Sequence, residues 1–208
     1  MSKRTVLRAN KGVRREQSQD FIFTREMAPY MNGNGSVPEF IKTYQADAWD
    51  VYTGLPIPTT SDEPWRRTNL RSMPVGSFRH LRPDDSDNKN MPAPPTEILA
   101  PDVGSLGGQI VLSPEVTKNV LNEKLSERGV VFTDLTTAVY KYPELLEKIL
   151  GQVVESNEGK FAALSAALSE SGVLVYVPAG VKVELPLHSV IWGPGIDRAY
   201  FSHILVWL

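Results

Sequence analysis

Three histidines, His80, His188 and His203, are the only ring-nitrogen candidates for metal binding or general-base chemistry in this sequence. None of them has a second histidine four residues away or stands beside a paired carboxylate motif, the spacings that gather metal ligands on one helix face. The sequence contains no cysteine, so it supplies no disulfide and no cysteine ligand for zinc or an iron–sulfur cluster. We therefore expect structural histidines and no metal site.

Two other patterns that often carry chemistry are incomplete. The glycine-rich stretch GSLGGQ at 104–109 lacks the Gly-Lys-Ser/Thr ending and the preceding strand of a phosphate-binding loop. Serines occur throughout, but none lies in a nucleophile elbow or near a partner histidine in the sequence. The sequence thus predicts no catalytic, cofactor-binding or metal-ligating residue.

The stretch EPWRRTNL at 63–70 places Trp65 beside Arg66 and Arg67. This group has the residue types of a recognition element. Alternatively, Trp65 anchors irregular chain to the fold while the arginines cover its ring or meet carboxylates. The second interpretation is the more ordinary one for a tryptophan in a polar connector, but spacing alone leaves both open.

Composition indicates a globular chain without a strong charge bias. The 208 residues are 41% hydrophobic and 22% charged, with a formal net charge of -2. This length allows one or two domains with a buried core, and nucleic-acid-binding domains usually carry a basic excess instead. No apolar run approaches the roughly 20 residues that cross a bilayer, and no secretory signal is visible. We expect no nucleic acid partner, no membrane association and a cytoplasmic location.

The elements that would position any site begin after a basic N-terminus. Residues 1–15 hold several basic side chains and no acid, so we expect a flexible basic segment over 1–35. Ser36 and Glu39 then have capping-box spacing at the start of an amphipathic helix, and Gly54 predicts its end. The residues expected on its apolar face are Phe40, Ile41, Tyr44, Ala48 and Val51.

A helical or mixed domain is expected over residues 36–160, with a Pro-rich, extended connector over about 56–104. After the connector, the apolar patterns predict a strand-helix-strand-helix module within about 105–155. Its expected elements are a strand over 109–112, a helix from Pro114 to about Arg128 capped by Ser113, a strand from Gly129, and helices over 136–142 and 143–150.

One more helix is predicted before the pattern changes. Phe161, Leu164 and Leu168 have helical spacing, and Gly172 is the expected stop. Beyond it, the sequence has the short apolar alternations of strands interrupted by turn residues. We therefore place the start of a β domain over residues 161–208.

The stretch SGVLVYVPAGVKVELPL at 171–187 alternates like a strand but is interrupted at Pro-Ala-Gly. Pro178 has no amide donor and Gly180 reaches backbone angles closed to other residues, so two short strands should meet at a corner. Val181 and Val183 would lie on one face of the second strand. Short strands joined by corners favour a coil whose turns stack in parallel, and the apolar run AYFSHILVWL suggests a coil that continues in a longer protein.

Two families share these motifs. VPAGV resembles the strand-turn of cupin barrels, but the following KVELPLHSVIW has one histidine and no His-x-His pair. GKFAALSAALSESGVLVYVPAGVKVELPL at 159–187 resembles the signature block of the SufB/SufD iron–sulfur assembly proteins. GLPIPTTSDEPWRRTNL and GVVFTDLTTAVYKYPELLEKIL are similar to upstream segments of SufD-type proteins, so the resemblance covers about 46–208 and favours SufD over SufB.

The resemblance implies an α+β fold: an N-terminal helical or mixed domain followed by the first turns of a right-handed parallel β-helix, here truncated. It also implies a non-catalytic subunit that works with a SufB-like subunit and a SufC-like ATPase. The iron–sulfur cluster would belong to the parent complex, with no cofactor bound by this segment. Trp65, Arg66 and Thr68 match a family motif that has no known chemical role. The alternatives are a cupin-like or carbohydrate-active enzyme on a short-stranded β fold and a pure interaction module.

Overall fold

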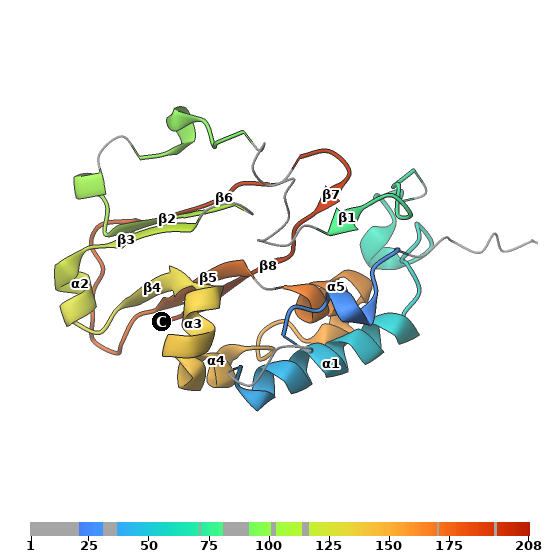
Figure 1. Cartoon of the computed structure of the whole chain (residues 1–208), viewed down its shortest axis with the longest axis horizontal. Coiled ribbons are helices and arrows are strands. Elements are labelled where there is room, and N and C mark those ends of the chain that lie inside the picture. Colours follow the sequence, from blue (N-terminus) through green and yellow to red (C-terminus); the bar gives the residue numbers. More distant parts are fainter. Residues whose placement is uncertain are drawn as a thin grey trace, which may run out of the picture.

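The computed structural model describes residues 21–30, 37–70, 72–80, 92–100, 103–113, 117–169, 171–193 and 195–208. Helices and strands are arranged in layers (Figure 1). Helices α1, α3, α4 and α5 lie on one side, the sheet containing β5 lies in the middle, and the sheet containing β2 lies beyond it.

The helices are α1 (Glu39–Gly54), α2 (Glu123–Glu127), α3 (Leu135–Lys141), α4 (Pro143–Ile149) and α5 (Lys160–Leu168). The strands are β1 (Arg79–His80), β2 (Gly108–Leu112), β3 (Thr117–Leu121), β4 (Val131–Asp134), β5 (Ser171–Tyr176), β6 (Leu187–Ile191), β7 (Arg198–Ala199) and β8 (Ser202–Trp207).

The strands of the described residues form sheets with the orders β3-β2-β6, β4-β5-β8 and β1-β7. Strand pairs close in sequence, β2 with β3 and β4 with β5, are antiparallel. Pairs distant in sequence are parallel: β1 with β7, β2 with β6, and β5 with β8. From β5 the chain therefore visits each sheet in turn and returns to lie beside its starting strand, where Ser171 pairs with Ser202.

The central sheet has apolar side chains on both faces, because neighbouring residues of a strand point to opposite sides. Leu174 packs with residues of α1, α3 and α4 in one core cluster. Val173 packs with Ile110, Leu112 and Phe132 in the core between the two larger sheets. The alternation predicted for β5 is therefore confirmed. One face of the strand packs on the helices and the other packs on the second sheet.

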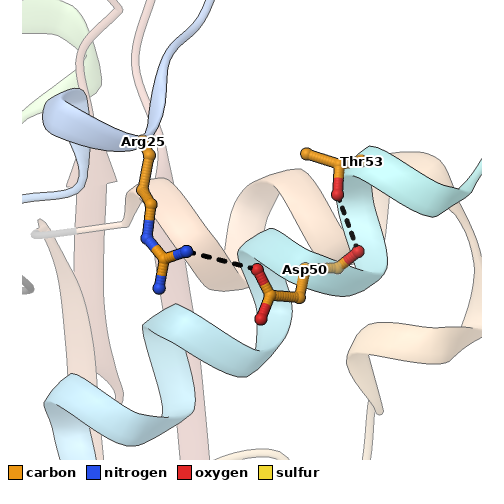
Figure 2. Close-up of polar contacts among 3 residues, drawn as sticks. All are labelled: Arg25, Asp50 and Thr53. Atoms are coloured by element: carbon orange, nitrogen blue, oxygen red, sulfur yellow. Dashed lines mark hydrogen bonds and ion pairs between the residues drawn. The ribbon is translucent and has the colours of Figure 1, made fainter.

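Residues 21–30 lie along the helical layer. Phe23 and Ala28 are buried in the core that α1 and α5 share. Arg25 reaches across the surface to Asp50 of α1 at 3.4 Å, and Thr53 donates a hydrogen bond to the Asp50 carbonyl (Figure 2). The remainder of the N-terminal segment expected over 1–35 lies outside the described residues.

Several predicted elements are confirmed at nearly their expected limits. Helix α1 ends at Gly54, while the capping residue expected at Ser36 lies outside the described residues. Strands β2 and β4 and helices α3, α4 and α5 occupy the positions predicted from their apolar patterns. Helix α3 begins with a side-chain cap, since Asp134 accepts a hydrogen bond from the Thr137 amide at 2.8 Å.

The helix predicted from Pro114 to about Arg128 is wrong. Thr117–Leu121 forms β3, paired along its whole length with β2, and only Glu123–Glu127 is helical. Residues 114–116 lie outside the described part. β-branched and Asn residues are weak helix formers, and the exposed edge of β2 offers their backbone a ladder instead. Asn122 then caps α2 by accepting from the Lys124 amide.

The corner at Pro178 and Gly180 exists, but the second strand predicted to contain Val181 and Val183 is wrong. Gly180 has a φ of 77°, and the Val181 amide closes a turn onto the Pro178 carbonyl. The next four residues are irregular, and the following strand is β6, which starts directly after Pro186. Because proline cannot donate to a ladder, Pro186 separates this loop from the strand.

Gly172 does not end a helix, contrary to prediction. Helix α5 stops at Leu168, and Gly172 lies within β5 opposite His203 of β8. Its φ is 142°, and a Cβ atom there would lie 1.9 Å from the His203 carbonyl oxygen. Glycine is therefore required by the close approach of the two strands.

The expected parallel β-helix and the domain limits at 1–35, 36–160 and 161–208 stay predictions. Within the described residues, no helix has the length and apolar character to cross a bilayer.

Candidate functional site

The three histidines lie apart in the fold. His188 on β6 shares a 2.9 Å hydrogen bond with Gln109 of the neighbouring strand β2. His80 packs edge-on against Phe23 and Phe201. His203 lies on β8, next to Tyr44 of α1. Among the residues that the structure describes, no group of three His, Cys, Asp or Glu side chains could hold a metal ion.

An aromatic cluster joins four distant parts of the chain. Phe21 packs against Phe23, Phe78 and Phe161, with ring centroids 5.6 to 6.2 Å apart. Trp65 packs on Phe161 at 5.1 Å, in agreement with the interpretation of Trp65 as an anchor of the connector. The cluster therefore fixes the connector, the N-terminal segment and α5 to one another.

The basic residues beside Trp65 lie on the surface. Arg66 pairs with Glu63 one turn earlier, at 3.4 Å, and both side chains are exposed. Arg67 and Thr68 are exposed as well, and the Thr68 amide donates to the Trp65 carbonyl. An exposed pair of this kind contributes only about 0–1 kcal/mol. Trp65 of this motif therefore has a structural role, whereas the polar side chain of Arg67 is exposed to solvent.

Polar groups are also buried within the helical layer, and Gln45 is at their centre. Its side chain is 2% exposed. Its Oε1 atom accepts a hydrogen bond from the Tyr30 amide at 3.1 Å, and its Nε2 donates to the Ser169 carbonyl at 2.9 Å. One side chain of α1 thereby holds the N-terminal segment and the end of α5 together.

Lys160 forms the second buried polar contact between α1 and α5. Its Nζ donates to the Tyr52 carbonyl at 2.9 Å and lies 3.8 Å from the centre of the Tyr52 ring. This carbonyl belongs to the last turn of α1, where the helix dipole favours a positive charge. Lys160 thus stabilises the C-terminal end of α1 from the first residue of α5.

His203 and Tyr44 lie side by side and are both partly buried, with ring centroids 6.4 Å apart. Burial lowers the pKa of His203 below its ordinary value and raises the pKa of Tyr44 above its own. In both cases burial disfavours the charged form. Both side chains are therefore neutral at physiological pH.

A larger hollow of about 340 Å³ lies beside β4, lined by polar groups of β3, β4 and α3. Asp134 in this hollow is already engaged as the cap of α3, and Asn119 donates to the Phe132 carbonyl at 3.1 Å. Its volume is within the range of ligand pockets. The side chains of Asp134 and Asn119 in this hollow therefore serve structural hydrogen bonds.

The sequence pattern missed Gln45, Lys160 and Ser169 as buried polar residues. For Gln45 a signal was available, because it shares a helix face with Ile41, Ala48 and Tyr52. Lys160 and Ser169 gave no such signal, since their partners come from more than a hundred residues away. None of the three has the setting of a catalytic group; all of them hold helices in place.

The arrangement so far defines a mixed helix-and-sheet protein whose polar contacts are structural. A family model, described as the SufBD protein N-terminal region, matches residues 26–188. This match covers most of the chain. The chain belongs to the SufB/SufD family.

The curated relatives carry names from the same family. The iron–sulfur cluster assembly protein SufD of Bacillus subtilis is 39% identical over 87 residues, covering 41% of this chain and 20% of that protein. An iron–sulfur cluster assembly SufBD family protein of Arabidopsis thaliana is 29% identical over 167 residues, covering 73% of this chain and 35% of that protein. A family member of Synechocystis is 36% identical over 84 residues, or 40% of this chain and 18% of that protein. The chain thus spans about a fifth to a third of the length of these relatives.

Proposed function

We propose that this chain is the N-terminal part of a SufD-type subunit in an iron–sulfur cluster assembly scaffold. The observation that carries the proposal is the family match over residues 26–188. The similarity to the Bacillus protein named SufD supports the SufD type over the SufB type. The role is non-catalytic, and the buried Gln45 and Lys160 side chains act in it as structural contacts between segments.

In this proposal the partners are a SufB-like subunit and a SufC-like ATPase, and the complex works in the cytoplasm. The chain has no cysteine, so the cluster would be held by other parts of the complex. In this proposal, the layered fold of this part of the chain has a structural role in the assembly scaffold.

We also propose that the strands from β5 onward begin a right-handed parallel β-helix. The path from β5 through β6 and β7 to β8, with a parallel return onto β5, supports this fold. Connections between parallel strands of one sheet are right-handed in nearly all proteins, which supports the hand.

Affinity purification of the full-length protein that contains this chain tests the function. The eluate is analysed by mass spectrometry and assayed for iron and sulfide, with a tagged 1–208 chain as the matched control. We expect SufB-like and SufC-like subunits with the full-length protein, and no iron or sulfide on the control. Recovery of the full-length protein alone, with a mononuclear metal or with glycan-cleaving activity, would refute the scaffold role.

A further inference from the structure

A small cavity lies where the helical layer meets β8. It has a volume of about 30 Å³ and lies between α1, α3, α4, the end of α5 and β8. Its polar lining comes from Tyr30, Tyr44, Gln45, Ser169 and His203, and the rest of its wall is apolar. Among the described residues that line it, none is a carboxylate, a lysine or an arginine.

Two polar atoms of this lining are buried without a hydrogen-bond partner among the described residues: the Ser169 hydroxyl and the His203 Nε2. Ser169 is 6% exposed. Its backbone is already engaged, since the amide donates to the Ser165 carbonyl and its own carbonyl accepts from Gln45. Buried polar groups nearly always have a partner, and a bare one costs stability. Both atoms therefore need a hydrogen-bond partner, and a molecule bound in the cavity can provide it.

The volume and the chemistry of the cavity favour a water molecule as that partner. A cavity needs roughly 10–15 Å³ of such space to hold one water, and a buried water typically has two to four polar partners. Pockets for organic ligands are usually roughly 300–1,000 Å³, far larger than this space. A divalent metal is disfavoured because the described part of the lining offers one imidazole and no carboxylate or thiolate.

We propose that the cavity binds one structural water that bridges the Ser169 hydroxyl and His203 Nε2. The neutral imidazole exchanges one hydrogen bond with the water, and the hydroxyl rotates to provide the second. Tyr44 and Gln45 line the same space and carry further polar groups. The water joins the end of α5 to β8, the strand that lies against β5, and so links the helical layer to the coil.

The position of the water is tested directly by a high-resolution crystal structure of the chain. We expect a density peak within about 2.7–3.2 Å of both Ser169 Oγ and His203 Nε2. A cavity without density overturns the proposal. A direct hydrogen bond from the Ser169 hydroxyl to the Ser165 carbonyl, with no peak between serine and histidine, also overturns it.

The energetic test uses Ser169→Ala, with Ser165→Ala in the last turn of α5 as the control outside the cavity. If the water bridges the two side chains, Ser169→Ala raises the unfolding equilibrium constant about tenfold, because the water and His203 lose a partner. The control changes it less than about threefold. If the hydroxyl has no partner, Ser169→Ala lowers the unfolding constant instead, which contradicts the proposal.

A double-mutant cycle with His203→Phe separates a shared water from two independent effects. A bridging water makes the two substitutions non-additive, so His203→Phe costs several-fold less in the Ser169→Ala background than in the wild-type chain. Additive effects overturn the bridge. His188→Phe, at a histidine that is bonded to Gln109 outside the cavity, is the matched control and is expected to be additive with Ser169→Ala.

Discussion

Replacing Gln45 by methionine should destabilise the helical layer strongly, although the two side chains have nearly the same shape. The substitution removes the acceptor of the Tyr30 amide and the donor to the Ser169 carbonyl. Ser169 is buried, so its carbonyl would lose its bond from Gln45 without access to bulk water. Tyr30 is half-buried, so water can partly replace Gln45 as the acceptor of the Tyr30 amide.

The magnitude follows from the cost of an unsatisfied buried group, about 1–3 kcal/mol each. We expect Gln45→Met to lower the free energy of unfolding by about 2–4 kcal/mol, a large fraction of the roughly 5–15 kcal/mol of a typical domain. Urea unfolding followed by far-UV circular dichroism measures this difference. Gln152→Met, the same substitution at an exposed position, is the control and should change stability by less than about 0.5 kcal/mol.

A Gln45→Met variant within about 0.5 kcal/mol of the wild-type chain would refute the reasoning. It would mean that the N-terminal segment and the end of α5 are held by apolar packing alone. The apolar contacts available for this are those of Phe23, Ala28 and Trp49, which share one core cluster with α5.

Three further perturbations test other contacts of the same layers. Gly172→Ala should cost at least about 3 kcal/mol and speed amide hydrogen exchange in β8, because the new Cβ atom collides with the His203 carbonyl; unchanged exchange would contradict the close approach. Lys160→Met should cost about 2 kcal/mol in urea unfolding, since the Tyr52 carbonyl loses a charged donor, whereas the exposed Lys182→Met should have no measurable effect. Burial lowers the pKa of His203, so this histidine binds a proton more readily in the unfolded chain than in the folded one. The contribution of neutral His203 to stability is therefore fully present above about pH 6.5 and is lost as the pH falls through the pKa of the folded state. Urea midpoints across this range should show a smaller acid loss for His203→Gln, and an identical pH profile would contradict the assignment.

Sequence patterns correctly predicted the elements in which apolar residues recur at the regular spacing of one buried face. Helices α3, α4 and α5 and strand β5 each present a regular apolar face, and the corner at Gly180 has residues that only a turn accommodates. For these elements the local preference and the final packing agree.

The failures have a common physical cause, which is pairing with residues distant in the sequence. Thr117–Leu121 has a mixed pattern, and its strand conformation comes from the ladder with β2. Gly172 looks like a helix stop until the return of the chain at His203 is known. Gln45 is a polar residue whose burial depends on groups of two other segments. None of these partners can be identified from spacing alone.

The proposed β-helix makes its own prediction at β8. Ile204 and Val206 lie in register with Val173 and Val175 of β5, on the face that points into the core between the sheets. Val173 is 1% exposed, whereas Ile204 is 60% and Val206 49% exposed. Apolar side chains that are buried in one turn of a coil are thus uncovered in the next, and a further turn stacked on β6 and β8 would cover them.

We therefore expect the double substitution Ile204→Thr with Val206→Thr to have little effect on stability in the 1–208 chain and a large one in the full-length protein. In the 1–208 chain it should change the free energy of unfolding by less than about 1 kcal/mol and reduce self-association, because the residues are exposed. In the full-length protein it should cost about 2–3 kcal/mol, because a covering turn buries both side chains. Val173→Thr, buried in either context, should be costly in both. Equally small effects of the double substitution in the two contexts would show that no further turn covers β8, and the β-helix proposal would then fail while the family assignment would stand.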